Sequence, residues 1–300
     1  MSYLAMLCLS LMLANGGPDE QEQTHPIPVV IADEARIALT IDKSERRDGG
    51  EWIRSSLLYD VILSAPDLDG RRAMTWNLKQ IDSKSAAKDI SSIPSIEMTV
   101  DETLSPVSVD NVEEIVAAAS RYVPDTADTG LIIQQLAATT PETAAALFAK
   151  DARLVAVGQG TDLYLGEDNP YEVEGAMPFG GAPITMIGSY RLHRYGAGVA
   201  EVRWSQHIDP ASLAKAVPSL LRSMLEASGA KGADGAEFET KLRTLMRSVR
   251  IENSSECTAF VDTQTGLAIK TECNETVEAV IGDQGYHRER RLVATQRILD

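Results

Sequence analysis

The chain has 300 residues and a formal net charge of −16, and aromatic residues make up only 5% of it. A field of this sign repels phosphate backbones, and few aromatic side chains are present to stack on bases, so we expect no nucleic-acid partner. The length is sufficient for one large domain, or two small ones, with an ample core.

Residues 1–15 predict a cleavable signal peptide. The first 14 residues carry no charged side chain, and this apolar run is shorter than the roughly 20 residues of a membrane-spanning helix. A buried N-terminal strand or helix is the alternative. Lipidation is not expected, because Cys8 lies inside the run rather than at its end. We therefore expect a periplasmic or secreted protein that is soluble and not transmembrane after cleavage.

Residues 16–26 form a polar stretch that we expect to be a flexible leader. Residues 27–300 then predict a single α+β domain. Two weakly similar halves, 27–150 and 151–300, are an alternative division, because each half contains a predicted hairpin with one tryptophan, Trp76 or Trp204, in its returning strand.

Strand patterns dominate the first part of the domain. Residues 36–42 alternate apolar and polar side chains, as a half-buried strand does. Residues 57–81 predict a hairpin around the turn Asp67-Leu68-Asp69-Gly70, a sequence of ordinary turn chemistry. Residues 95–100 and 106–109 are shorter candidate strands.

A helical block follows. Asp110 and Glu113 resemble a capping box, and apolar residues then recur at helical spacing up to Val123. Residues 131–136 indicate a second helix. Thr140 and Pro141 predict the start of a third helix, with threonine as N-cap and proline at the first helical position.

Strand patterns return in the second half of the chain. Residues 153–157 and 162–165 predict strands, and residues 184–194 and 199–208 predict a hairpin. Asp209 and Pro210 begin a helix with a strong apolar stripe, and residues 238–246 suggest another helix. Strands complete the chain, so the overall pattern is that of an α+β fold with an antiparallel sheet and helices grouped in insertions.

The two cysteines that remain after signal cleavage predict a disulfide. Cys257 and Cys273 lie on two predicted strands that flank a turn ending at Gly266, a residue able to adopt positive φ. If the loop spans residues 264–266, residues whose numbers sum to 530 face each other, and Cys257 and Cys273 are such a pair. A disulfide between facing cysteines is expected in an exported chain.

No catalytic, cofactor or metal motif is complete. The S-x-x-K patterns Ser85 to Lys88 and Ser212 to Lys215 lack the companion motifs of penicillin-recognising enzymes and predict solvated helix surface. The four histidines do not form a metal-binding spacing, and we expect them at the surface or rim. We therefore predict no cofactor.

The loop of residues 175–183 is apolar and rich in glycine and proline. Met177 and Phe179 are candidates for the rim of an apolar ligand cavity. Alternatively, these two side chains fill the core beneath the loop.

Residues 260–272 resemble a strand pair of exported bacterial envelope proteins: a strand reaching Asp262, a Thr-Gly-Leu turn and a strand returning to Glu272. More distantly, the segment is similar to outer-membrane lipoprotein carriers of the LolA/LppX type. The resemblance implies a curved antiparallel sheet, half-barrel-like, with helices covering it. It covers about 40 residues of this chain and assigns no functional residue.

Three functions are compatible with the sequence. The first is an exported envelope protein with a non-catalytic structural or interaction role and an envelope protein as partner. The alternative is a binding module for a lipid-like or apolar ligand. The second alternative, a hydrolase that uses carboxylates, has the least support, because no pair among the 44 Asp and Glu residues stands out.

Overall fold

A computed structural model describes residues 24–27, 31, 34–83, 92–121, 133, 136–155, 162–175, 183–227, 250–281 and 284–299. Most of these residues lie in strands. In chain order the elements are β1 (Thr24–Pro26), β2 (Ala35–Arg47), β3 (Ile53–Leu63), β4 (Arg72–Ser83), β5 (Ile96–Val100), β6 (Pro106–Val109), α1 (Val112–Ala119), α3 (Pro141–Phe148), the 3-10 helix η2 (Lys150–Leu154), β7 (Asp162–Tyr164), β8 (Asp168–Gly175), β9 (Ile184–Gly196), β10 (Val199–Ile208), α4 (Pro210–Ala227), β11 (Arg250–Asp262), β12 (Ala268–Ile281) and β13 (Gln284–Leu299).

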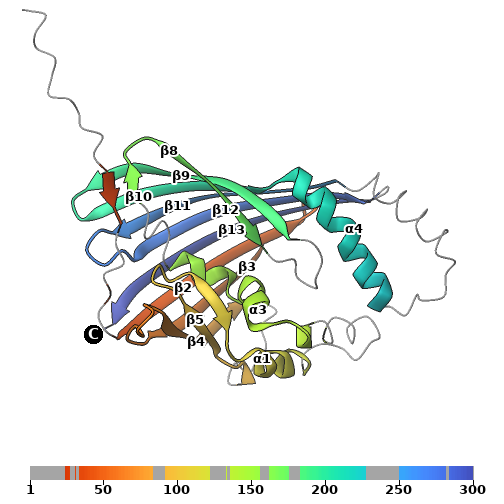
Figure 1. The fold of residues 1–300 in the computed structure, drawn as a ribbon, viewed down its shortest axis with the longest axis horizontal. Coiled ribbons are helices and arrows are strands. Elements are labelled where there is room, and N and C mark those ends of the chain that lie inside the picture. The colour runs from red at the N-terminus through yellow and green to blue at the C-terminus, as the bar shows by residue number, and fades with distance from the viewer. Residues whose placement is uncertain are drawn as a thin grey trace, which may run out of the picture.

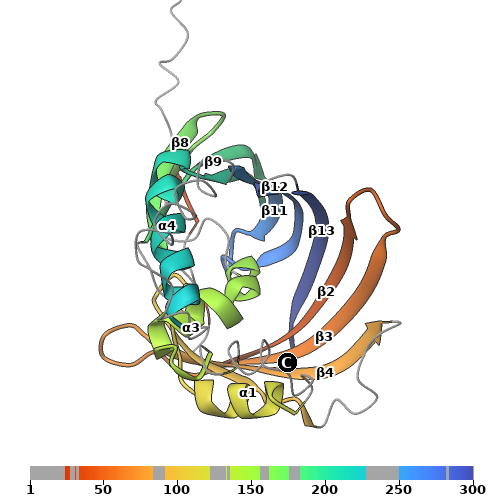
Figure 2. The same ribbon diagram turned by 90° about the vertical axis from the view of Figure 1, so that its right-hand side faces the viewer.

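Eleven strands form one antiparallel sheet in the order β6-β5-β4-β3-β2-β13-β12-β11-β10-β9-β8. Within β2 to β6, and again within β8 to β13, each strand pairs with the next one along the chain. The two meanders join where β13 pairs with β2, from Arg288 opposite Arg47 to Leu299 opposite Arg36. The sheet is curved and open, with β6 and β8 at its edges (Figures 1 and 2). A curved antiparallel sheet is therefore confirmed.

One face of the sheet carries the larger core. Ile37, Leu39 and Ile41 alternate along β2 with more exposed residues and are fully buried. The same core contains Val116 of α1 and Ala144 of α3. We call the face that these residues share the inner face, and the opposite face of the sheet the outer face.

A smaller core lies under the strands of the second meander. The short strands β1 and β7 pair with each other, from Thr24 opposite Tyr164 to Pro26 opposite Asp162. Ile27 and Leu163 pack there against Val202 on β10. Residues 24–26, the end of the expected leader, thus form a strand.

Several local predictions are confirmed. Leu57 pairs with Ile81 in the β3–β4 hairpin. In the turn between these strands, the Asp67 carboxylate accepts hydrogen bonds from the backbone N–H groups of Asp69 and Arg71. The Thr140 side chain accepts from the Thr143 N–H at the start of α3, and proline occupies the first turn.

Other local predictions are wrong. Asp110 does not cap α1, because its carboxylate accepts hydrogen bonds from Ser108 and Thr99; Asn111 is the N-cap residue instead. Residues 150–154 form η2 rather than a strand. The Val155 carbonyl accepts hydrogen bonds from the Ala268 N–H and the Gln296 side chain, which fixes this segment across the inner face.

The β9–β10 hairpin also differs from the expected register. A two-residue turn within residues 195–198 would place His193 opposite Ala200 and His207 opposite Met186. The structure pairs Ala200 with Tyr195 and His207 with Ile187, because the turn lies one residue later and His193 is left over in a bulge. The turn uses positive φ at Ala197 and Gly198.

The predicted signal peptide and the helix expected at residues 238–246 lie outside the described residues, as does the pattern from Ser85 to Lys88. Among the helices in the described part of the chain, none combines the length and apolar character that crossing a bilayer requires.

Candidate functional site

Cross-strand pairing brings aromatic and aliphatic side chains together on the inner face of β8, β9 and β10. Asn169, Tyr190 and Trp204 form one row across these strands, because partners in register share a face. The next two rows along the strands follow by alternation. The three rows together contribute six apolar or aromatic residues, which we call the inner patch: Tyr171, Val173, Met186, Tyr190, Trp204 and Ile208.

The inner patch is only partly covered. Val173 remains 42% exposed, and the other five residues are half-buried. Tyr190 and Trp204 pack against the edge of the smaller core, but none of the six belongs to the buried residues of either core. The patch is therefore a contiguous apolar surface on the inner side of the sheet.

A glycine organises the aromatic part of this patch. Tyr171 lies across Gly188 on the neighbouring strand, where a Cβ atom would stand 2.5 Å from the tyrosine Cζ and 2.4 Å from the Ser205 carbonyl oxygen. The Tyr171 ring stacks on Tyr190 with 4.8 Å between centroids, and its hydroxyl donates to Gln206 Oε1 at 3.1 Å. These contacts also hold the edge strand β8 in register.

The disulfide lies beside the inner patch. Cys257 faces Trp204 on one side and is bonded to Cys273 on the other, so the predicted pairing is confirmed. The numbers of facing residues in this hairpin sum to 530 as far as the pair Phe260 and Lys270. A bulge beyond that pair shifts the register. Both cysteines are buried in the larger core, which gives the bond a structural role.

Charged side chains gather farther across the inner face, on β12, β13 and β2. Asp151 of η2 forms ion pairs with Lys43 and with Arg290, whose Nη2 lies 3.3 Å from the carboxylate. Arg290 also pairs with Glu275 at 3.3 Å, and these two side chains are only 14% and 13% exposed. Two cations and two carboxylates thus neutralise one another and attach η2 to the sheet.

This charged cluster changes the acidity of a neighbouring phenol. The pKa of Tyr59 is raised from 10.0 to about 12, first because the side chain is buried and second because the charge of Asp151 opposes a phenolate. Tyr59 also lies against Trp76, with 5.1 Å between ring centroids. The ring is therefore a neutral packing group at ordinary pH.

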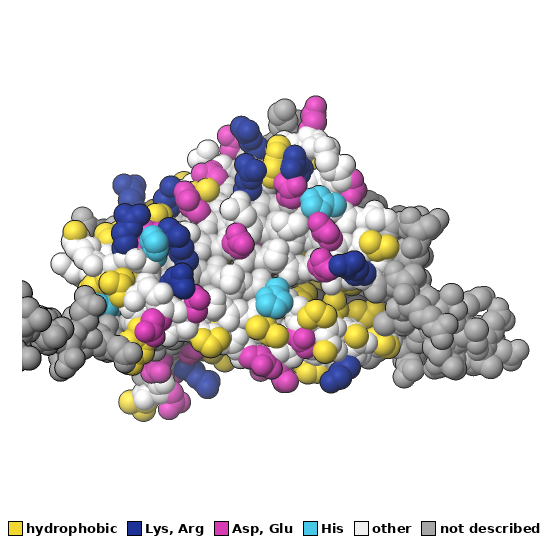
Figure 3. Space-filling model, turned by 90° about the horizontal axis from the view of Figure 1, so that it is seen from above, with side chains coloured by type: hydrophobic (Ala, Val, Ile, Leu, Met, Phe, Trp, Pro, Cys, Tyr) yellow, Lys and Arg dark blue, Asp and Glu magenta, His cyan; other side chains and the backbone are white. Residues whose placement is uncertain are grey.

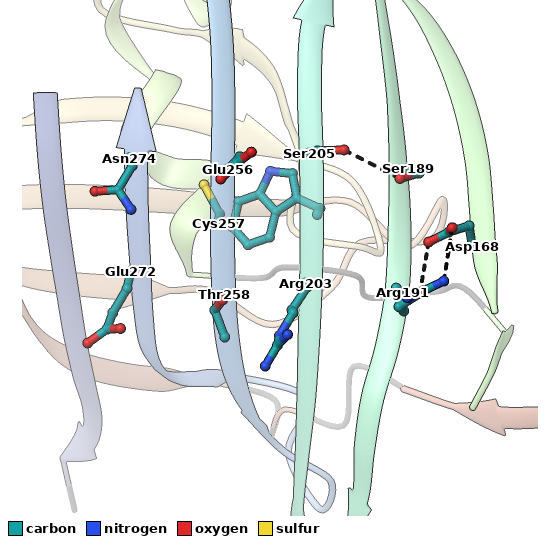
Figure 4. Close-up of a pocket in the computed structure, with 11 residues that line it drawn as sticks. Asp168, Ser189, Arg191, Arg203, Ser205, Glu256, Cys257, Thr258, Glu272 and Asn274 are labelled. Carbon is teal, nitrogen blue, oxygen red and sulfur yellow. Dashed lines mark hydrogen bonds and ion pairs between the residues drawn. The ribbon is translucent and has the colours of Figure 1, made fainter. Parts of the chain in front are cut away.

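The outer face has a polar hollow of about 400 Å³ above β8 to β12. Two rows line it: one of charged side chains that includes Asp168, Arg191 and Arg203, and one of short polar side chains that includes Ser189 and Ser205 (Figure 4). Figure 3 shows this side of the molecule, with mostly backbone and other uncoloured side chains in the middle and charged groups mainly around them.

The two arginines that line this hollow are paired locally. Arg191 pairs with Asp168 at 2.9 Å, and Arg203 pairs at 2.7 Å with Glu201, a buried carboxylate that Arg194 also contacts. Ion pairs of this kind stabilise neighbouring strands and leave little positive charge for a ligand. The inner patch is therefore the better candidate site.

Residues singled out in the sequence are distributed as follows. His193 and His207 are exposed, as expected, on the two strands of one hairpin, and His287 lies between Glu278 and Glu289. Ser212 is buried rather than solvated: its hydroxyl accepts a hydrogen bond from the Thr185 N–H and fixes the start of α4 to β9. Among the described residues, no three His, Cys, Asp or Glu side chains form a metal-binding group.

Met177 and Phe179 lie in segment 176–182, outside the described residues. Gly175, just before this segment, pairs with Ile184 at the start of β9. The inner patch itself was not identified from the sequence. The alternation of Asn169, Tyr171 and Val173 could have indicated β8, but Pro170 and three acidic residues obscured the strand pattern.

Comparison with known proteins identifies no family. No family model matches the chain, and no curated protein matches it. Among solved structures, a chain from a study of lipid–protein interactions in lipovitellin is similar with a TM-score of 0.44 and 8% identity over 89% of this chain. This chain covers only 25% of that lipovitellin chain.

A second similar structure is OccK10 (OpdN) of Pseudomonas aeruginosa. It has a TM-score of 0.21 and 7% identity over 90% of this chain and 100% of its own. Similarity at these levels establishes neither a family nor a function for this chain.

Proposed function

We propose that the protein is an exported, non-catalytic binding module that holds a lipid-like or apolar ligand against the inner patch. The observation that carries the proposal is the contiguous patch itself: six aromatic and aliphatic side chains on the inner side of a curved sheet, outside both buried cores. Soluble proteins seldom leave such surfaces uncovered without a partner or ligand.

The surroundings of the patch suit a ligand with a mainly apolar body. Aromatic and aliphatic walls with a few fixed polar groups are typical of small-molecule sites. Here the polar groups are the amides of Asn169 and Gln206, which lie in the same rows as the aromatic rings. Helix α4 begins two residues after Ile208, and we propose that it covers the ligand together with the loop that carries Met177 and Phe179.

An alternative is a non-catalytic structural or interaction protein, the first of the three functions compatible with the sequence. The filled larger core, into which both α1 and α3 insert, supports this reading because it leaves part of the inner face without space for a ligand. The two functions differ in whether a small apolar molecule binds to the isolated protein.

A fluorescent fatty acid, dansyl-labelled undecanoic acid, tests the proposal. We expect saturable binding with energy transfer from tryptophan, because Trp204 lies in the patch. Val173→Asp should weaken binding at least tenfold, since the new carboxylate would have to lose water against an apolar ligand. Ile62→Asp is the matched control: Ile62 is 44% exposed, similar to Val173, but lies on the outer face. Equal binding by both variants, or none by the natural protein, would refute the proposal.

A further inference from the structure

The end of the sheet where β2 turns into β3 carries an unusual charge. Residues 46–54 form this turn and its flanks, and residues 286–291 begin the neighbouring strand β13. Two hydrogen bonds connect the two segments: the Asp48 N–H donates to the His287 carbonyl, and the His287 N–H donates to the Asp48 carboxylate, both at 2.8 Å. We call these two segments the arginine tip.

The arginine tip is basic in a strongly acidic chain. It contains six arginines and three carboxylates, whereas the whole chain has a net charge of −16. Two of the arginines are paired with carboxylates outside the tip, Arg47 with Glu45 and Arg290 with Asp151 and Glu275. The arginines are Arg46, Arg47, Arg54, Arg288, Arg290 and Arg291. The carboxylates are Asp48, Glu51 and Glu289.

Two exposed guanidinium groups at the tip lack a carboxylate partner. Arg291 pairs with Ser44 across the sheet, and Ser44 pairs with Arg54, so both arginines project from the outer face on either side of a serine. Neither forms an ion pair with any residue in the described ranges. Their Cα atoms lie two strands apart, about 10 Å. Glu289 is already bound to Arg46, at 2.7 Å.

Apolar side chains accompany these charges. Trp52 lies between two guanidinium groups, with Arg46 at 4.9 Å and Arg291 at 4.7 Å from the ring centroid. Ile53 beside it is 65% exposed, and Tyr286 on β13 is 36% exposed. Figure 2 shows the turn at the rim of the sheet, projecting away from its neighbours.

We propose that the arginine tip docks the protein on an anionic lipid surface. Tryptophan, tyrosine and arginine are the residues that anchor proteins at the headgroup level, and each cation near such a surface is attracted by the lipid charge. A projecting turn with Trp52 and Ile53 suits insertion between headgroups better than it suits a concave protein interface. Because the chain as a whole is acidic, docking through the basic tip would favour one orientation on an anionic surface.

Vesicle co-sedimentation of the full chain tests this docking. We expect binding to vesicles of equal parts phosphatidylcholine and phosphatidylglycerol, little binding to phosphatidylcholine alone, and loss of binding at high salt. The variant Arg54→Glu/Arg291→Glu should lose at least tenfold in affinity, and Ile53→Asp should also weaken binding. Circular dichroism would verify that each variant is folded.

The control reverses the same amount of charge at the opposite end of the molecule. Arg71 and Arg297 are exposed and have no ion pair within the described part of the chain. Arg71 lies at the turn between β3 and β4 and Arg297 near the end of β13, both at the end of the sheet opposite the tip. Arg71→Glu/Arg297→Glu should bind these vesicles as the natural protein does, or nearly so.

Three results would overturn the proposal. The first is equal binding to neutral and anionic vesicles, and the second is retention of binding by Arg54→Glu/Arg291→Glu. The third is binding to soluble polyglutamate but not to vesicles, which would indicate an acidic protein partner instead. Docking does not rest on the proposed ligand site, and Val173→Asp should leave vesicle binding unchanged.

Discussion

Gly188 has a specific steric role in the inner patch. Its missing side chain leaves the space into which Tyr171 lies, and no larger residue fits between that ring and the Ser205 carbonyl. The stacking of Tyr171 on Tyr190 therefore depends on glycine at this position. A sequence pattern does not show this, because the two residues approach only after β8 pairs with β9.

We expect Gly188→Ala to lower the free energy of unfolding by about 1–3 kcal/mol, the usual cost of overpacking a tight site. Urea unfolding measures this change. Gly285→Ala is the matched control, because a Cβ atom at Gly285 meets nothing within 4 Å and the residue also lies in a strand. Equal losses in the two variants would contradict the steric role of Gly188.

Tyr59 gives a prediction for alkaline pH. Its pKa in the folded protein is about 12 against 10.0 in the ordinary state, so folding favours the protonated phenol. The corresponding stabilisation is complete below about pH 10 and is lost as pH rises through about pH 12. We expect Tyr59→Phe to unfold with less pH dependence over this interval.

Titration of the phenolate absorbance checks the same point. In the natural protein, one tyrosine should ionise later than the others, and this late step should be absent in Tyr59→Phe. Asp151→Asn should lower the pKa of Tyr59, because the opposing charge is removed. A Tyr59 that ionises with the exposed tyrosines would show that the ring is not buried beside Asp151.

At the scale of elements, the β11–β12 hairpin was the most predictable part of the chain. Its turn residues, its alternation and the cysteine positions all specify one register, and the structure has that register at Cys257 and Cys273. The disulfide closes a loop with a sequence separation of 16 residues. Such a loop should stabilise the fold by about 3 kcal/mol.

Removing this bond gives a direct measurement. We expect Cys257→Ala/Cys273→Ala to lose about 3 kcal/mol in urea unfolding, and reductant to destabilise the natural protein by a similar amount. The double variant should not respond to reductant, which separates the effect of the disulfide from other effects of the reagent. A natural protein whose stability is unchanged by full reduction would contradict the assignment.

Elements whose position depends on distant contacts were predicted less well. Residues 153–157 are apolar enough for a strand, but the hydrogen bonds of Val155 to Ala268 and Gln296 hold the segment across the sheet after a 3-10 helix. The bulge at His193 similarly moved the register of the β9–β10 hairpin. In each case partners far away in the sequence decide the local structure.

At the scale of the whole molecule, the curved antiparallel sheet was predictable, but the seam of the sheet was not. Strands β2 and β13 are at opposite ends of the chain and share twelve paired positions. No turn connects them, so no local signal specifies their register. Pairing across this seam places Lys43 beside Leu292, which itself pairs with Cys273. The same pairing assembles the charged cluster and the arginine tip, because each takes residues from both strands.

The central claim is that the inner patch holds a lipid-like or apolar ligand, and native mass spectrometry tests it most directly. The protein would be purified gently from its own host, weighed intact and then extracted with organic solvent. We expect a bound lipid on the natural protein and on Ile62→Asp, and none on Val173→Asp. A ligand-free mass for the folded natural protein would contradict the claim and favour a structural or interaction role.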